Sequence, residues 1–400
     1  MYSGGFSKPR LDRLHSMMAR HVANGSLPGI VMLVSRHGET HVGAHGSHTA
    51  GGPMPMRRDS IFRIASAGKP MTAAVAMMLV EEGKLRLDDP VDAFLPELAN
   101  RQVLRSLTGP LTDTVPAQRP ISLRDLLTLR MGLGAIMMWP PQYPIQQAQT
   151  DAGIAPGPDM WQGTPDDYMK RIGSLPLVHQ PGEGWLYHTG LDVAGVLLER
   201  ASGKPLAALM HERLFGPLGM KDTAFFVPPD KIDRLVTFYR GEADGKLAVH
   251  DESRGGRWSK PPQFAAGGGG TVSTVDDGLA FGRLMLNKGK HGNERLLSRA
   301  SVDLMTTDQI GATQKAAFPF YPGFWDSWGW GLGGAVVTAR TDIHMTPGRF
   351  GWDGGYGTSL YMDPVEDLVG ILFTQKMMNS PAAPPVYQDF WTGTYQALGD

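Results

Sequence analysis

The 400-residue sequence contains no cysteine. Disulfides, thiolate metal sites and a cysteine nucleophile are therefore all excluded. The sequence also lacks an excess of charge of either sign, because 38 lysines and arginines balance 39 aspartates and glutamates. A chain so close to neutral has no electrostatic footprint for nucleic acid or for an anionic membrane surface. We therefore expect a small-molecule partner, and neither nucleic acid nor membrane.

Long apolar runs are missing too. No window approaches 18 uninterrupted apolar residues, and residues 1–22 carry scattered charges without an apolar run of signal-peptide length. These absences predict a soluble, cytoplasmic protein. The P-loop motif GK[ST], the zinc motif HExxH and the GxSxG of ordinary α/β-hydrolases are also absent, and the twelve histidines show no metal-ligand spacing. We expect no metal and no organic cofactor.

Glycine and proline, in contrast, are abundant, with 51 and 31 residues, while 42% of the chain is hydrophobic. This balance predicts a compact, loop-rich protein, which we interpret as a single domain over residues 1–400 with a helical and loop-rich cap at about 95–250. Strands are expected near both chain ends, with helices between them. The fold class is therefore α/β (α+β), with a mostly antiparallel sheet built from both ends and an inserted helical region. Apolar periodicity predicts helices over 9–23, 65–82, 123–129 and 191–201, and strands over 29–35, 40–44, 329–337, 358–362 and 368–374.

Residues 131–167 differ in character from their surroundings, being rich in Met, Pro, Gln and Trp. A loop of that length inside a compact chain is usually functional, and we expect it to cover the site. Several tryptophans lie in loop-rich segments and together could wall an apolar acyl pocket. They are Trp139, Trp161, Trp325, Trp328 and Trp330.

The sharpest chemical signal is Ser66-Ala67-Gly68-Lys69, at the start of the helix predicted over 65–82. A spacing of three residues places both side chains on one helix face. A serine hydroxyl becomes a useful nucleophile when a neighbouring base accepts its proton, and a buried lysine with a lowered pKa is such a base. At a helix start the serine N–H is also free to bind an oxyanion. The alternative is that Ser66 is only a helix cap.

The surroundings favour catalysis. Residues 60–98 closely resemble the nucleophile region of the serine β-lactamase and penicillin-binding-protein superfamily, especially class C β-lactamases and family VIII carboxylesterases. The resemblance continues, in the family's order and approximate spacing, through 121–128, 181–190, 267–274 and 350–359. It implies the β-lactamase/D,D-peptidase-like fold and an acyl-enzyme formed on Ser66.

The resemblance also assigns roles to residues far from Ser66. Tyr187 would shuttle a proton beside Lys69, and the N–H of Gly355 would be the second oxyanion donor besides that of Ser66. Trp352, Gly354 and Thr189 would contact the substrate.

Two departures from the family pattern bear on the substrate. Trp352 stands where lactamases and peptidases carry lysine, so the cation that anchors a substrate carboxylate is missing. Thr189 replaces an asparagine whose amide holds substrate amides and the catalytic lysine, and its shorter side chain cannot make both bonds. His188, between Tyr187 and Thr189, could face the ligand, but we interpret it as structural.

These departures favour a carboxylesterase that cleaves small to medium, uncharged acyl esters. The alternatives are a β-lactamase, D-aminopeptidase, amidase or acyltransferase of the same superfamily. A further alternative, from a different class, is a non-catalytic relative that binds an acyl ligand or a protein.

Overall fold

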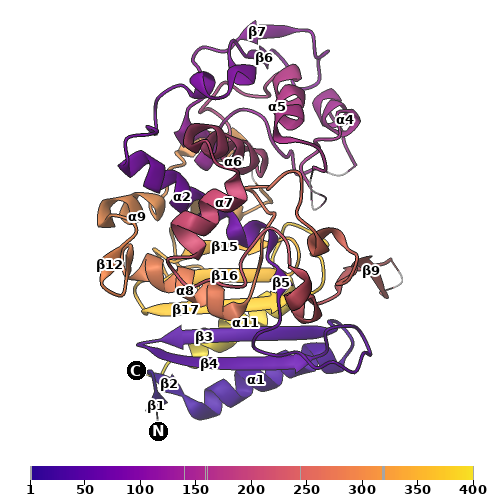
Figure 1. The fold of residues 1–400 in the computed structure, drawn as a ribbon, viewed down its shortest axis with the longest axis vertical. Helices are drawn as coiled ribbons and strands as arrows, with labels where there is room; N and C mark the ends of the chain where they lie inside the picture. Colours follow the sequence, from indigo (N-terminus) through magenta and orange to yellow (C-terminus); the bar gives the residue numbers. More distant parts are fainter. Residues whose placement is uncertain are drawn as a thin grey trace.

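The computed structural model describes residues 2–138, 140–157, 159, 161–243, 245–317 and 320–399. Its largest element is a seven-stranded sheet in which every neighbouring pair is antiparallel. Figure 1 shows strands from the start of the chain, in indigo, beside strands from its end, in yellow, which confirms the predicted sheet. In spatial order the strands are β13 (Trp328–Trp330), β14 (Ala335–Val337), β15 (Phe350–Gly354), β16 (Thr358–Asp363), β17 (Leu368–Thr374), β3 (Gly29–Arg36) and β4 (Glu39–Gly46).

The single strand predicted over 329–337 is wrong, because this segment forms the hairpin of β13 and β14. Three glycines lie in the four residues between the two strands. Gly333 has φ +79°, a conformation that glycine adopts without steric cost, and a Cβ there would lie 2.6 Å from the Cβ of Ala73. The turn therefore reverses the chain against a neighbouring helix, and no strand can run through it.

The two faces of the sheet belong to two separate cores. In β3 the side chains of Val31 and Leu33 enter one core, while those of Ile30, Met32 and Val34 enter the other. This two-sided burial explains the unbroken apolar run of that strand. Helices α1 (Lys8–Ala23) and α11 (Pro385–Gln396) cover one face, and α8 (Val275–Leu286) covers the other.

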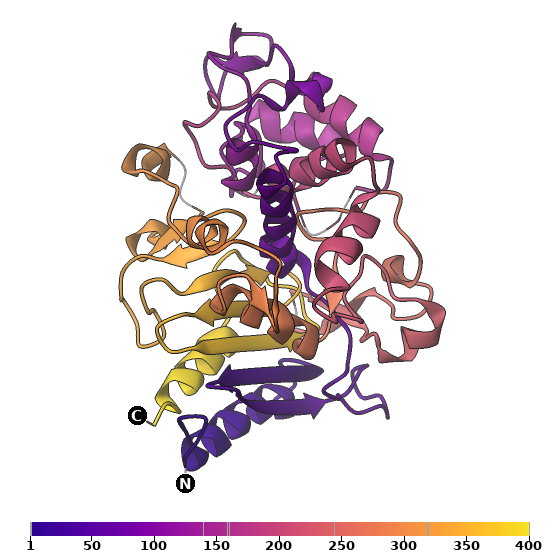
Figure 2. The ribbon, with the colours of Figure 1, turned by 60° about the vertical axis from the view of Figure 1, so that its left-hand side comes forward.

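Helix α2 (Lys69–Glu81) lies between the sheet and the helical region, and Figure 2 shows it, in indigo, at the centre of the molecule. Residues 69–79 are buried all round the helix, and small side chains let its neighbours approach closely. Figure 1 shows α4 (Pro144–Asp151), α5 (Pro165–Ser174) and α6 (Thr189–Ser202) above α2. The helical region also contains α3 (Leu123–Leu127) and α7 (Leu206–Met210).

Smaller elements complete the described chain. No helix within it has the length and apolarity needed to cross a bilayer. The remaining helical segments are η1 (Ala65–Gly68), η2 (Val91–Ala93), η3 (Pro96–Leu98), η4 (His211–Phe215), η5 (Pro229–Arg234), η6 (Arg257–Ser259), α9 (Arg299–Met305), α10 (Ala312–Ala317) and η7 (Phe324–Asp326). Two-stranded pairs are β1 (Tyr2–Ser3) with β2 (Phe6–Ser7), β5 (Phe62–Arg63) with β10 (Val272–Ser273), β6 (Gln102–Leu104) with β7 (Thr114–Pro116), β8 (Phe238–Gly241) with β9 (Leu247–Asp251), and β11 (Lys290–His291) with β12 (Glu294–Arg295).

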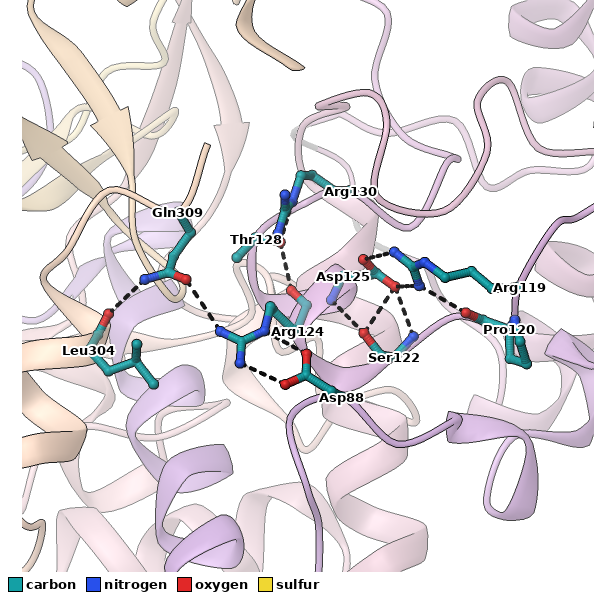
Figure 3. Close-up of polar contacts among 10 residues, drawn as sticks. All are labelled: Asp88, Arg119, Pro120, Ser122, Arg124, Asp125, Thr128, Arg130, Leu304 and Gln309. Carbon is teal, nitrogen blue, oxygen red and sulfur yellow. Dashed lines mark hydrogen bonds and ion pairs between the residues drawn. The ribbon is translucent and has the colours of Figure 1, made fainter. Parts of the chain in front are cut away.

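Helix α3 is fixed by a polar network at its first turn (Figure 3). Ser122 and Asp125 form a reciprocal capping box, in which each side chain accepts a backbone N–H from the other residue. Arg119 donates to both carboxylate oxygens of Asp125, at 2.6 and 2.8 Å. Arg124, the residue before Asp125, pairs with Asp88 at 2.6 and 2.8 Å. These contacts hold the short helix in the helical region.

Replacing Asp125 by alanine removes the cap and the partner of Arg119, and should lower the free energy of unfolding by about 1–2 kcal/mol. Urea unfolding followed by circular dichroism measures the change. The matched control is Asp113→Ala, which breaks a pair with Arg105 in which both side chains are at least half exposed. That change should cost less than about 1 kcal/mol. Equal losses in the two variants would contradict this account of the cap.

Candidate active site

Ser66 lies in η1, the tight turn that leads into α2. The residue before it, Ala65, has φ +46°, which is uncommon for a residue with a side chain. The end of β15 packs directly against this turn, because a Cβ on Gly354 would lie 2.2 Å from the carbonyl oxygen of Ile64. The serine is therefore held between the sheet edge and the helix.

Lys69 lies one turn further on, with its side chain fully buried. Its Nζ donates to Ser66 Oγ at 2.7 Å, to the carbonyl oxygen of Gly268, and to His188 Nδ1 at 3.3 Å. Burial lowers the pKa of Lys69 to about 7, although the charge of Asp192 opposes the shift. The lysine is thus poised to exchange a proton near neutral pH.

The three partners of Nζ define where a proton can move. A neutral amine keeps two N–H bonds and one lone pair. Gly268 and His188 offer only acceptors, so the two N–H bonds point to them and the lone pair points to the Ser66 hydroxyl. In this arrangement Lys69 can remove the proton from Ser66 without any reorientation.

His188 joins the lysine to a buried carboxylate. Its Nε2 lies 3.0 Å from Asp192 Oδ2, which assigns the proton to Nε2 and leaves Nδ1 as the acceptor for Lys69. Asp192 Oδ1 accepts the N–H of Gly268 at 2.7 Å. Burial alone would raise the pKa of Asp192, but His188, Lys69 and the Gly268 N–H lower it overall. The carboxylate therefore stays ionised and fixes the imidazole.

The backbone at His188 is strained. Its φ of +80° and ψ of −68°, together with the bond from Thr189 N–H to the Tyr187 carbonyl at 3.1 Å, define a γ-turn with a positive φ, a rare conformation. This turn lies directly after Tyr187 and at the start of α6. Strain of this kind concentrates at functional sites.

Tyr187 completes the polar group around Ser66. Its hydroxyl accepts the indole N–H of Trp352 at 2.5 Å, and its ring centroid lies 4.8 Å from Lys69 Nζ. Burial raises the pKa of Tyr187 well above its usual value, against the opposing effects of hydrogen bonds with Ser66 and Trp352. The phenol is therefore neutral near pH 7, and Lys69 is the group that can act as the base.

Two residues with predicted oxyanion-binding N–H groups lie at the cavity. Ser66 and Gly355 both line the cavity, and within the described chain neither N–H donates to a backbone acceptor. A Cβ on Gly355 would meet no atom within 4 Å, so space for a substrate lies there. The Gly355 carbonyl is held by the N–H of Met378 at 2.8 Å, which fixes the peptide plane. An oxyanion hole needs two N–H donors at such a cavity, so the position of both residues is compatible with that predicted role.

The cavity has a volume of about 670 Å³ and is mostly aromatic near Ser66. The stretch 131–167 contributes to its wall through Ala135, Met137, Pro156 and Gly157, although it contains α4 and is not one continuous loop.

Of the tryptophans predicted to wall the pocket, Trp328 lines the cavity, whereas Trp161 packs on Tyr168 and Arg171 instead. Trp325 and Trp330 make edge-to-face contacts with Trp185 and do not line the cavity, and Trp139 lies outside the described residues.

The structure brings together Ser66, Lys69, Tyr187, Trp352 and Gly355. It does not bring Gly354 or Thr189 to the cavity wall. Gly354 is needed for the close approach of β15 to η1, and Thr189 is buried at the first residue of α6.

His188 and Asp192 contact the site, and neither is among the site residues that the sequence predicts. The available signal was their spacing of four residues at a predicted helix start, next to Tyr187.

The chain is similar to several known proteins. A family model described as Beta-lactamase matches residues 14–388. Protein Rv1367c of Mycobacterium tuberculosis is 40% identical over 357 residues, which cover 88% of this chain and 86% of that protein. Esterase EstB of Burkholderia gladioli is 30% identical over 392 residues, 93% and 92% of the two chains. Among solved structures, "EstCE1, a hydrolase with promiscuous acyltransferase activity" superimposes with a TM-score of 0.80 at 25% identity, over 96% of this chain and 98% of that one.

The pKa of Lys69 predicts the pH dependence of turnover. Only the neutral amine can accept the serine proton, so kcat/KM for p-nitrophenyl butyrate should rise with pH, with an apparent pKa of about 7, and level off above it. Lys69→Arg, whose guanidinium stays protonated, should lose both the activity and the rising limb. A rate that is independent of pH between 5 and 9 in the wild type would contradict the assignment.

The contact of His188 with Lys69 predicts a second effect. His188→Ala leaves the amine free to turn its lone pair away from Ser66, so kcat should fall on the order of 10- to 100-fold, and by more than KM rises. His188→Asn keeps an acceptor near the Nδ1 position and tolerates a positive φ, so it should recover much of kcat. Steady-state kinetics on variants whose folding has been checked by thermal unfolding measures these effects. An equal loss of kcat in His188→Ala and His188→Asn would show that the hydrogen bond is irrelevant.

Proposed function

Since the chain belongs to the beta-lactamase family, we propose that it is a carboxylesterase that cleaves small to medium acyl esters through an acyl-enzyme on Ser66. One observation carries the proposal. The Nζ of the fully buried Lys69 lies 2.7 Å from Ser66 Oγ, and Ser66 lines a cavity together with Tyr187 and Gly355.

The proposed reaction begins with transfer of the Ser66 proton to the neutral amine of Lys69. The serine oxygen attacks the ester carbonyl carbon, and the N–H groups of Ser66 and Gly355 bind the resulting oxyanion. Collapse of this intermediate breaks the bond to the alcohol, which takes the proton back from Lys69 through the hydroxyl of Tyr187. Water then repeats the same steps on the acyl-enzyme and releases the acid.

The cavity supports an ester substrate over one that carries a carboxylate. The lining residues of the described chain include neither lysine nor arginine, so no cation is available to pair with a substrate anion. At the position where lactamases carry lysine, Trp352 donates its indole N–H to Tyr187. The similarity to EstB supports the same reaction class.

Acyl transfer to an acceptor other than water is a second candidate. EstCE1 is described as having promiscuous acyltransferase activity. The cavity of this chain has an aromatic wall that includes Phe320, Phe324 and Trp352. Apolar walls disfavour water relative to an organic alcohol in the deacylation step. Added alcohols and amines distinguish this activity from simple hydrolysis.

Replacing Ser66 by alanine tests the nucleophile. The variant should lose turnover of p-nitrophenyl butyrate by at least about 10⁴-fold, and it should no longer be labelled by a fluorophosphonate probe. Nitrocefin and a panel of amides, assayed beside the ester, address the lactamase, aminopeptidase and amidase alternatives. Retained esterase activity in Ser66→Ala would overturn the assignment. Failure of the wild type to react with the probe would favour a non-catalytic binding protein.

A further inference from the structure

The cavity continues past the catalytic residues and around the end of β15. Strand β14 pairs with β15 only at Phe350 and Gly351, so Trp352 and Asp353 have no strand partner on that side. Alternation along the strand directs Trp352 toward the core around α2 and Asp353 toward the opposite face of the sheet. Both residues line the same cavity, which therefore reaches both faces.

The part of the cavity beyond the strand edge, here called the Asp353 lobe, has aromatic walls. The rings of Trp328 and Tyr361 lie 5.7 Å apart, and Phe324 stacks on Trp328 at 6.2 Å. Tyr321 contacts Phe324 at 5.2 Å. Burial and the nearby charge of Asp353 raise the pKa of Tyr321 to about 12, so its phenol stays neutral. The residues that define this lobe are Asp353, Tyr321, Phe324, Trp328 and Tyr361.

The carboxylate of Asp353 is only partly satisfied. Its Oδ1 is shielded from solvent and has no hydrogen-bond partner within the described chain. Burial raises the pKa of Asp353 to about 6, against lowering by Ser359, Arg349 and Tyr361. The group is therefore mainly ionised at pH 7. A buried anionic oxygen without a partner is costly, and a ligand that supplies a positive charge removes that cost.

Among the described residues, no lysine or arginine lines the lobe beside this carboxylate. The other charged residue on the wall is Asp342, which is also acidic and is half exposed. His344 is neutral near pH 7, because burial lowers its pKa to about 4. Arg349 does not line the cavity; its guanidinium lies over the rings of Tyr361 and Trp391, 4.2 and 3.8 Å from their centroids, and its charge lowers the pKa of Asp353 without outweighing burial. The wall is thus acidic and aromatic together.

We propose that the Asp353 lobe binds an ammonium group of the substrate, with Asp353 as its counter-ion and the aromatic rings as its walls. Carboxylates and aromatic faces both attract cations, and the attraction is strongest where water is excluded. The preferred substrates are therefore esters with a cationic group on the acyl or the alcohol side. This inference rests on the proposed esterase function and specifies its substrate class.

Two pairs of isosteric esters test the proposal. Butyrylcholine and 3,3-dimethylbutyl butyrate differ only in a quaternary nitrogen or carbon on the alcohol side. The p-nitrophenyl esters of 4-(trimethylammonio)butyric acid and 5,5-dimethylhexanoic acid differ in the same way on the acyl side. Wild-type kcat/KM should be roughly tenfold higher for the cationic member of at least one pair. The pair that shows this preference identifies whether the alcohol side or the acyl side of the substrate enters the lobe.

The variant Asp353→Asn should abolish that preference while changing kcat/KM for the neutral isosteres less than about threefold. Asp342→Asn, on the same wall but half exposed, is the matched control and should leave the preference largely unchanged. An equal loss of kcat/KM for both members of a pair in Asp353→Asn would overturn the proposal. A wild type that hydrolyses p-nitrophenyl butyrate but prefers neither cationic ester would overturn it too. A wild type that cleaves no ester would instead overturn the proposed function.

Discussion

The site depends on keeping one amine unprotonated without contact with water. Desolvation of Lys69 supplies the driving force, and the charge of Asp192 limits it, so that the lysine pKa settles at about 7. Without the carboxylate the amine would be a weaker base, and with a fully exposed side chain it would be protonated at neutral pH. His188 lies between the two groups, with Nε2 near Asp192 and Nδ1 near Lys69 Nζ. The carboxylate therefore holds the imidazole, and the imidazole orients the amine.

The backbone that presents these groups is strained on both sides of the cavity. Ala65, next to Ser66, and His188, next to Tyr187, both have positive φ. Such conformations persist only where the surroundings over-determine them. The first is held by the end of β15 and the buried helix α2, and the second by helix α6, whose residues 189–198 are buried. The core on the α2 side of the sheet, which contains buried residues of both α2 and α6, thus stabilises this backbone geometry.

Sequence spacing predicted those contacts of the site that join residues close together in the sequence. Ser66 and Lys69 share one helical turn, so their contact follows from spacing alone. Tyr187 and Gly355 are distant in sequence and were identified only through the resemblance. His188 was interpreted as structural, because its partners on α2 and in the glycine-rich segment come together only in the folded chain.

The fold was predictable to a similar extent. The alternating and continuous apolar runs located β3, β16 and β17, and their antiparallel sheet followed from the order of elements. The hairpin of β13 and β14 was missed, because its turn depends on the contact of Gly333 with Ala73. Ala73 lies on α2, which is far from Gly333 in sequence but next to it in the fold. Likewise, the start of α6 directs Thr189 into the core, an orientation that a motif match does not reveal.

The buried lysine also ties the stability of the protein to the proton that drives its chemistry. In the unfolded chain Lys69 has a pKa near 10.5, and in the folded chain about 7. Between these values the unfolded state binds more protons than the folded state, so the contribution of this group to the free energy of unfolding increases as the pH rises from about 7 to about 10.5. At and below neutral pH the fold bears the full cost of burying the amine. The alkaline range that fully deprotonates Lys69 for catalysis is thus also the range in which its burial destabilises the protein least.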